Sequence, residues 1–222
     1  YGDKSFGTTY QEQAKMYRKW YKEQYRLYYQ EWSNTKDTYF KGVLINNYIY
    51  KGPMLEWYMR IKCRLDGYYD LWDRLIPRNA SIVDIGCGYG QMSFMLALLS
   101  AERNVLGIDY DNDKIDFCNN SFLCKNRNIK FLCADSRTVD IPKADAILFN
   151  DSLHYVDVES QRSILLKSVA SLNEGGMILV RDGDVSQTEK HEKIKRTELW
   201  STRIIKFNRT STELVFVSEK WM

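Results

Sequence analysis

The sequence contains few of the residues from which a metal site or a disulfide framework is built. It has two histidines, and its five cysteines, at positions 63, 87, 118, 124 and 133, form no C-x-x-C pair and no metal-ligand spacing with the histidines. An odd number of scattered cysteines indicates reduced thiols, which are typical of the cytosol. We therefore expect a cytoplasmic protein without a bound metal.

Long apolar runs and a strong net charge are also absent. No stretch approaches the roughly 20 apolar residues that a membrane-spanning helix needs, and no signal-peptide pattern is present. The net charge of +3 is mild and gives no reason by itself to expect nucleic acid. The 222 residues, 44% of them hydrophobic, suffice for one domain of ordinary size and an additional segment. The chain begins with Tyr1, so we expect a fragment or a trimmed chain.

Residues 1–78 differ from the rest of the chain in composition. They hold 19 of the 31 aromatic residues, and 14 Lys or Arg against 9 Asp or Glu. A first helix is expected because five aromatic residues recur at helical spacing and would share one face. These residues are Tyr17, Tyr21, Tyr25, Tyr28 and Trp32. A second helix is expected from Met54 to about Leu75, with Pro53 near its first turn.

The basic, aromatic faces of these helices allow three interpretations. They could pack against the rest of the chain or against a second copy in a homodimer. They could rest on a membrane surface or cover an acyl-chain pocket. They could also stack the bases of single-stranded nucleic acid, but we do not expect this partner because no RNA-binding motif accompanies the aromatic residues. We therefore divide the chain into a helical extension (1–78) and a second domain (79–222).

From Ala80 onward, short apolar runs alternate with helix-like stretches near 91–102, 112–125 and 159–172. Strands are expected at Ile82–Ile85, Val105–Ile108, Ile129–Cys133, Ala146–Phe149 and Met177–Val180. This alternation indicates an α/β fold with a parallel sheet and helices on both faces. Ligands of such sheets bind beyond the carboxyl ends of the strands, so the residues after each strand should carry the chemistry.

The first expected strand contains Asp84 and runs into glycines at 86, 88 and 90. A strand, a glycine-rich turn and a helix can bring backbone N–H groups close to a ligand, because glycine tolerates positive φ and has no Cβ. The spacing here is G-x-G-x-G. The dinucleotide fingerprint is G-x-G-x-x-G, so a nicotinamide cofactor fits this loop less well.

Acids follow the later strands as well. Asp109 lies 19 residues after Gly90, at the end of the second strand, where it could accept hydrogen bonds from a ribose diol. Its alternative role is a helix N-cap, which Asp111 or Asn112 fits better. Asp135 follows the third strand.

The fourth and fifth strands are followed by the most reactive side chains. His154 is a candidate general base or acceptor-orienting group; its alternative role is structural. Tyr155 could shape the pocket, and Asp151 could contact the substrate or the cofactor's amino group. The segment Arg181–Asp184 could bind a polar part of an acceptor, or its charges could pair among themselves. His191 is a weaker candidate.

The series of motifs over residues 80–184 resembles that of the class I S-adenosylmethionine-dependent methyltransferases. It comprises the glycine loop, Asp109, Asp135, Asn150-Asp151 and the turn at Gly175-Gly176. The resemblance implies a doubly wound, mostly parallel Rossmann-like sheet, S-adenosylmethionine as the cofactor, and an adenine-amino contact for Asp135. It implies cofactor-binding roles for Asp84, Gly86, Cys87, Gly88, Gly90, Asp109, Tyr110, Asp135, Ser136 and Asn150. The candidate catalytic residues are His154, Asp151 and Tyr155.

More narrowly, Asp151–Tyr155 with Arg181–Asp184 is similar to bacterial methyltransferases associated with lipid and aryl-polyene type biosynthesis, and Asn47–Pro53 resembles a junction in that group. We therefore expect O- or C-methylation of a small hydrophobic or aromatic acceptor, phenolic or acyl-type. The alternatives are a nicotinamide-dependent oxidoreductase and a non-catalytic, cofactor-binding scaffold whose N-terminal helices bind a partner or a membrane.

The C-terminal part departs from the seven-stranded sheet of this family. After the fifth strand only Arg203–Phe207 and Glu213–Val217 remain as strand candidates, which could pair as a hairpin. We expect the last strand to be short, absent or lost from the chain.

Overall fold

The computed structural model describes residue 19 and residues 39–65, 69–183 and 215–216. The chain divides into two compact units, Tyr1–Leu65 and Asp66–Met222. Several expectations lie outside the described residues: the aromatic stripe at 17–32, Asp184, His191 and the strand at 203–207. Of the expected last strand only Val215 and Phe216 are described, and they are not in a strand.

The described part of the first unit is helical. It contains α2 (Tyr39–Asn46), the 3-10 helix η2 (Ile49–Lys51) and α3 (Pro53–Leu65). Pro53 occupies the first position of α3, where its missing N–H would have had no partner within the helix. Where one helix was expected from Met54 to Leu75, the structure has α3 and, in the second unit, α4 (Tyr69–Leu75).

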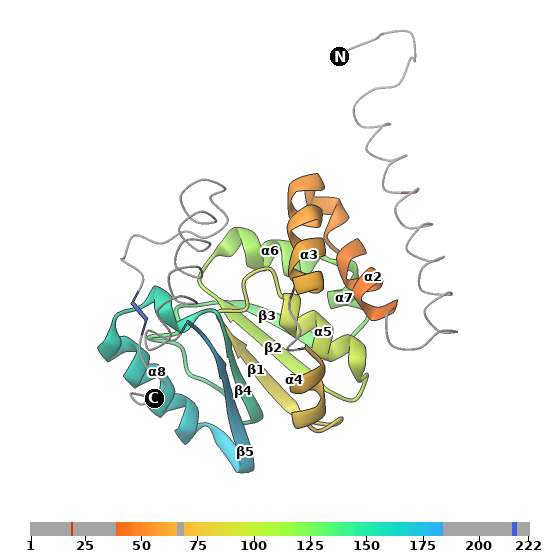
Figure 1. Ribbon diagram of the computed structural model, residues 1–222. Coiled ribbons are helices and arrows are strands. Elements are labelled where there is room, and N and C mark those ends of the chain that lie inside the picture. Colours follow the sequence, from red (N-terminus) through yellow and green to blue (C-terminus); the bar gives the residue numbers. More distant parts are fainter. Residues whose placement is uncertain (1–18, 20–38, 66–68, 184–214, 217–222) are drawn as a thin grey trace, which may run out of the picture. The chain divides into compact units, whose positions relative to one another are not determined.

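The second unit contains a five-stranded sheet in which every pairing is parallel (Figure 1). Its strands are β1 (Ser81–Ile85), β2 (Asn104–Asp109), β3 (Ile129–Cys133), β4 (Ala144–Asn150) and β5 (Leu172–Arg181). Their order in the sheet is β3-β2-β1-β4-β5. The parallel sheet and all five expected strands are therefore confirmed. The central strands β1 and β4 are buried almost throughout, as strands covered on both faces are.

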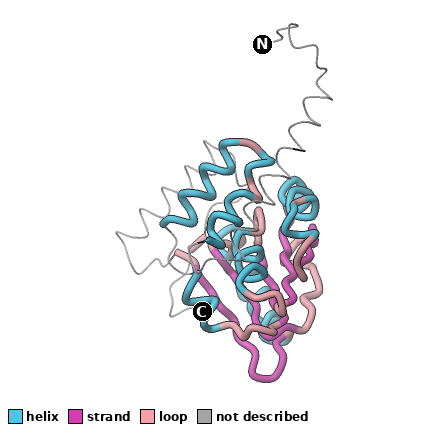
Figure 2. The backbone as a smooth tube through the Cα atoms, turned by 90° about the vertical axis from the view of Figure 1, so that its right-hand side faces the viewer, coloured by secondary structure: helices cyan, strands magenta, loops and turns pink. Residues whose placement is uncertain are grey.

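Helices cover both faces of this sheet, and Figure 2 shows the strands with helices on either side. Successive side chains of β1 point to opposite faces. Asp84 meets Ser93 of α5, whereas Val83 and Ile85 belong to the apolar cluster that includes Ile164 of α8. The chain runs from β1 through α5 to β2, and from β4 through α8 to β5. Because these crossovers lead in opposite directions along the sheet and share one hand, their helices lie on opposite faces.

In the described part of the second unit, four α-helices follow β1, and a side chain caps the start of each of them except the first, which begins after Gly90. They are α5 (Gln91–Leu99), α6 (Asn112–Asn120), α7 (Phe122–Lys125) and α8 (Val158–Ala170), with the 3-10 helix η3 (Leu153–Tyr155) before α8. Asp111 accepts from the Asp113 amide at 3.1 Å, which confirms it as the N-cap of α6. The helix expected over 112–125 is broken at Ser121, whose side chain caps α7 by accepting from the Cys124 amide.

The expected turn at Gly175-Gly176 lies inside β5 as an irregularity. Ala144 pairs with Leu172 and Ala146 with Met177, so the intervening residues of β5 bulge out of register. Gly175 has a φ of 74°, and a Cβ on Gly176 would lie 2.9 Å from the Asn173 carbonyl oxygen. Glycine is therefore required at both positions of this bulge.

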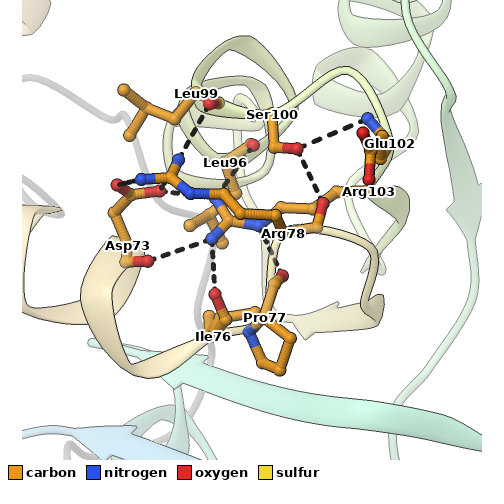
Figure 3. Close-up of polar contacts among 9 residues, drawn as sticks. All are labelled: Asp73, Ile76, Pro77, Arg78, Leu96, Leu99, Ser100, Glu102 and Arg103. Carbon is orange, nitrogen blue, oxygen red and sulfur yellow. Dashed lines mark hydrogen bonds and ion pairs between the residues drawn. The ribbon is translucent and has the colours of Figure 1, made fainter.

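A buried arginine fastens α4 to the edge of the sheet where the strands begin. The Arg103 side chain is 0% exposed and its Nη1 lies 2.6 Å from an Asp73 carboxylate oxygen (Figure 3). The guanidinium also donates to the carbonyl oxygens of Asp73, Ile76, Pro77 and Leu96, at 2.6–3.3 Å. These carbonyls belong to the end of α4, the segment after it, and α5. One fork-shaped cation therefore satisfies groups that a smaller side chain would leave unpaired.

We predict that Arg103→Leu lowers the free energy of unfolding by about 3–5 kcal/mol, because it leaves Asp73 with one cation fewer and several carbonyls without donors. The matched control is Arg78→Leu. Arg78 also pairs with Asp73, at 2.9 Å, but its side chain is 58% exposed, so its loss should cost no more than about 1 kcal/mol. Denaturant unfolding measures both. Equal losses in the two variants would contradict this account of Arg103.

Candidate functional site

All five strands of the second unit end at the same edge of the sheet, because they are parallel. The segments that leave this edge are the glycine loop after β1, and the residues that follow β2, β3, β4 and β5. Neighbouring strands β1 and β4 are followed by crossovers that lead in opposite directions. Ligands of open α/β sheets bind at such a switch point. The structure therefore brings the expected site segments to one edge.

The glycine loop leaves β1 in a left-handed conformation at all three expected glycines. Their φ angles are 73°, 55° and 72° for Gly86, Gly88 and Gly90. A Cβ on Gly88 would meet nothing within 4 Å, so this side of the loop is open. Cys87 lies within the loop, and its Sγ is 3.8 Å from the Gly88 carbonyl oxygen. Burial raises the pKa of the Cys87 thiol well above its usual range, so the thiol is neutral.

Gly86 and Ser152 approach each other closely at the switch point. A Cβ on Gly86 would lie 2.4 Å from the Ser152 Cβ, a distance that no packed structure allows. The Ser152 hydroxyl donates to the Ile85 carbonyl oxygen at 2.9 Å. This hydrogen bond fastens the segment after β4 to the end of β1. Gly86 is thus required both for its φ and for the contact between the two segments.

Asp109 lies at the end of β2 and joins that strand to the glycine loop. Its carboxylate accepts from the Gly88 amide at 2.8 Å and from the Asp111 amide at 2.9 Å. The side chain is buried. Two carboxylate oxygens offer about four acceptor positions, so two donors leave capacity for a ribose diol. The structure therefore places Asp109 where the sequence predicted a ribose-binding acid, beside the open Gly88.

Asp84 is buried beneath the loop and faces helix α5. It accepts a hydrogen bond from the Ser93 hydroxyl at 2.5 Å. Burial, with a smaller contribution from the nearby Asp109 charge, raises the pKa of Asp84 to about 6. Because burial disfavours the charged form, Asp84 is protonated in mildly acidic solution, and its hydrogen bond with Ser93 joins β1 to α5.

Asp135 follows β3, and its carboxylate is held by Arg137. The Arg137 Nη2 lies 2.6 Å from an Asp135 oxygen, and the Arg137 backbone amide donates to the other oxygen at 2.9 Å. These hydrogen bonds hold the pKa of Asp135 below its usual range. Tyr110, after β2, is 54% exposed, and Ser136 is half-buried. Ala134 donates to the Asp109 carbonyl oxygen at 3.0 Å, which keeps the two strand ends adjacent.

The segment after β4 begins with Asn150 and Asp151. Asp151 has a φ of 54°, and its amide donates to the Arg181 carbonyl oxygen at 2.7 Å. The Arg181 Nη1 lies 2.5 Å from an Asp151 carboxylate oxygen and 3.3 Å from the Asn150 side-chain oxygen. Arg181 thus pairs with Asp151 across the two strand ends.

His154 and Tyr155 lie in η3, just beyond this pair. The His154 side chain is 1% exposed, and its Nδ1 lies 2.5 Å from an Asp182 oxygen. The Tyr155 ring centroid is 4.2 Å from that of His154. The structure therefore gives the candidate base a carboxylate partner from the neighbouring strand end.

Four residues of this arrangement were not assigned a role from the sequence. Ser93 binds Asp84, Ser152 binds the end of β1, Asp182 binds His154, and Phe216 stacks on the His154 ring. A serine within an apolar helix, or a phenylalanine far along the chain, gives no local signal of such a role. Asp182 was noticed only as a charge in the segment Arg181–Asp184.

Within the described residues, no group of three or more His, Cys, Asp or Glu side chains could hold a metal ion. None of the helices in this part of the chain has the length and apolar character that crossing a lipid bilayer requires.

The chain is similar in sequence to known proteins. A family model described as a methyltransferase domain matches residues 82–176. A carboxy-S-adenosyl-L-methionine synthase from Shewanella sp. (strain W3-18-1) is 25% identical over 158 residues. The match covers 66% of this chain and 65% of the relative. The corresponding synthase from Shewanella baltica (strain OS155) is 23% identical over the same length. The chain thus spans 65% of the length of these curated relatives.

Solved structures share the fold. The PH0226 protein from Pyrococcus horikoshii superposes with a TM-score of 0.52 at 19% identity, over 60% of this chain and 63% of that one. The YcgJ protein from Bacillus subtilis superposes with a TM-score of 0.53 at 14% identity, over 68% and 62%. The second unit thus has the Rossmann-like sheet of these structures, and its residues 82–176 match the methyltransferase-domain model.

The pKa of Asp84 predicts how stability depends on pH. A carboxyl group that binds its proton more tightly in the folded chain stabilises the fold below its unfolded pKa of 3.8, and this stability is lost as pH rises to about 6. Relative to Asp84→Asn, the wild-type free energy of unfolding should therefore fall by about 3 kcal/mol between pH 4 and pH 7.

Denaturant unfolding at several pH values measures this difference. Asp116→Asn is the control for the loss of one carboxyl group, because Asp116 is exposed on α6. A difference between wild type and Asp84→Asn that stays constant over this pH range would show that Asp84 titrates normally.

Proposed function

We propose that this protein is an S-adenosylmethionine-dependent methyltransferase that acts on a small acceptor. The observation that carries the proposal is the contact between Gly88 and Asp109. It sets an open, side-chain-free loop beside a buried carboxylate that has acceptor positions to spare. This combination suits a ribose, whose two hydroxyl groups need an acceptor and whose ring needs close access to the backbone.

Different residues at the carboxyl ends of the strands would contact different parts of such a nucleoside. Asp109 would accept from the ribose hydroxyls. Asp135 would accept from the adenine amino group while Arg137 keeps it ionised, and the exposed Tyr110 would lie along the base. When bound, S-adenosylmethionine supplies an electrophilic methyl group on its sulfonium. The chain's own part is to exclude water and to align the acceptor, which contributes up to about 7–11 kcal/mol in favourable systems.

His154 is the group that would remove the acceptor's proton. A positioned base typically contributes roughly 10²–10⁴-fold to a rate. His154 follows β4, the strand next to the glycine loop, and Asp182 holds its Nδ1. The Asp151–Arg181 pair at the neighbouring strand ends would contact a polar part of the acceptor, because both side chains are partly exposed.

The acceptor that fits best is phenolic or acyl-type, modified on oxygen or carbon. Methylation of a phenol or of an activated carbon requires the removal of a proton, which His154 would accept. The 19 aromatic residues within positions 1–78 would suit a lid for an apolar acceptor or a contact with a membrane surface. The resemblance to methyltransferases of lipid and aryl-polyene type biosynthesis supports the same acceptor class.

A second candidate function is the synthesis of a carboxylated cofactor. It is favoured by the curated relatives, which are carboxy-S-adenosyl-L-methionine synthases. Arg181 at the sheet edge supports it, because a guanidinium is well suited to a carboxylate.

Binding of the cofactor can be tested without knowledge of the acceptor. Asp109→Ala should weaken the binding of S-adenosylmethionine at least about 10-fold, since it removes charge-assisted hydrogen bonds to the ribose and the anchor of Gly88. Titration calorimetry measures this, with Asp116→Ala as the control for the loss of one acidic charge. Equal affinity of Asp109→Ala and wild type would exclude Asp109 from the site.

The role of His154 is tested by turnover. His154→Ala should bind S-adenosylmethionine and lose methyl transfer by about 10²-fold or more. The assay incubates the protein with S-adenosylmethionine and a panel of phenols and acyl thioesters, and mass spectrometry identifies the products. A methylated acceptor with S-adenosylhomocysteine supports methyl transfer. A carboxylated nucleoside, formed in a parallel assay to which a carboxyl donor is added, supports the second candidate. Full activity of His154→Ala would remove this residue from the mechanism.

A further inference from the structure

We propose that Asp182 and Phe216 are positioning residues for His154. Asp182 holds the imidazole proton on Nδ1, so that the lone pair is on Nε2, and Phe216 fixes the plane of the ring. The proposal rests on the proposed function in one respect, the role of His154 as the base. The arrangement itself is a property of the folded chain and can be measured without substrate.

The contacts of Asp182 determine which ring nitrogen carries the proton. One carboxylate oxygen, Oδ1, lies 2.5 Å from the His154 Nδ1 and 2.7 Å from the Gly183 amide nitrogen. The other, Oδ2, accepts from the His154 backbone amide at 3.2 Å. An ionised carboxylate only accepts hydrogen bonds, so the Nδ1 that faces it must be the donor. Both side chains are buried, at 1% and 4% exposed for His154 and Asp182, so water does not compete for this bond.

The three donors also fix the carboxylate itself. The amides of His154 and Gly183 hold its two oxygens in place, and the first of these amides belongs to the same residue as the imidazole. Backbone and ring of His154 thus bind one group from the end of β5. This arrangement follows the rule that the partner of one imidazole nitrogen sets the tautomer and therefore the chemistry of the other nitrogen.

Phe216 contacts the ring itself. Its centroid lies 4.7 Å from that of His154, with 21° between the planes, and Tyr155 contacts the same imidazole at 4.2 Å and 42°. Two aromatic neighbours restrict rotation of the ring about its χ2 angle.

The chain next to Phe216 is fastened at both of its backbone polar groups. The Val215 amide donates to the His154 carbonyl oxygen at 2.8 Å, and the Val215 carbonyl oxygen accepts from the Gln161 side chain at 2.8 Å. The same Gln161 amide nitrogen donates to the Val156 carbonyl oxygen at 3.0 Å. A residue more than 60 positions away in the sequence is thereby held against the segment after β4.

Nitrogen NMR on the full chain tests the assignment directly. The protein has two histidines, so His191→Gln assigns the signals of 15N-labelled His154. At a pH at which the imidazole is neutral, we expect the Nδ1 nitrogen to show the chemical shift of a protonated nitrogen. The Nε2 nitrogen should show the shift of an unprotonated one. Free histidine favours the opposite tautomer, so a signal from Nε2–H in the wild-type protein would overturn the proposal, whatever any variant does.

A pair of variants separates positioning from a merely structural role. In Asp182→Asn the amide oxygen can take the place of Oδ1 and keep its two hydrogen bonds, so the Nδ1–H tautomer should persist. In Asp182→Ala no acceptor remains, and the population should shift toward Nε2–H. Identical tautomers in wild type and Asp182→Ala would refute the role of Asp182. Circular dichroism checks that each variant folds. If Asp182→Ala does not fold, the tautomer measured in the wild-type protein decides the proposal.

The role of Phe216 has its own readout. Stacked rings shift the carbon-bound protons of the His154 imidazole upfield, and Phe216→Leu should move these signals downfield while it keeps an apolar side chain at this position. Unchanged proton shifts would show that Phe216 does not hold the ring. Calorimetry with S-adenosylmethionine on the wild-type protein reports separately on the proposed function. Absence of cofactor binding would end that function and leave the tautomer result valid.

Discussion

The close approach of Gly86 and Ser152 is the constraint on which the candidate site depends. A Cβ on Gly86 would lie 2.4 Å from the Ser152 Cβ, and the Ser152 hydroxyl is bound to the Ile85 carbonyl oxygen. Glycine at this point lets the segments after β1 and β4 meet where the strand order reverses. The open loop at Gly88 and the candidate base His154 thus belong to one edge of one sheet. A side chain on residue 86 would separate the segments that bind a cofactor from those that act on an acceptor.

Two buried charged groups of the second unit, Arg103 and Asp109, lie at opposite ends of the strands. At the edge where the strands begin, Arg103 is buried with Asp73 and four carbonyl groups, and its role is to hold α4 and α5 together. At the opposite edge, Asp109 is buried with two backbone donors and has acceptor capacity left. The Arg103 network and the Asp109 network share no residue, so a mutation in one should have little effect on the other.

The sequence predicted the parts of this molecule that depend on local patterns. Alternating apolar runs located all five strands. The sequence also located the acids near the carboxyl ends of the first three strands: Asp84 within β1, Asp109 at the end of β2 and Asp135 after β3. The break of the helix at Ser121 was missed because apolar residues continue at helical spacing beyond it, whereas the Ser121 side chain caps a new helix by accepting from the Cys124 amide. The pairing of His154 with Asp182 joins residues 28 apart and depends on the register between β4 and β5, which no local pattern encodes. The contact between His154 and Phe216 joins residues that lie still farther apart in the sequence.

The central claim, that this sheet edge binds an adenosyl compound through Asp109 and the glycine loop, is tested most directly by a crystal structure with S-adenosylhomocysteine. The account predicts that the ribose hydroxyls lie within hydrogen-bonding distance of the Asp109 carboxylate and that the adenine amino group lies at Asp135. A ligand bound away from the carboxyl ends of β1 and β2, or crystals of folded protein that take up none of the compound, would contradict it.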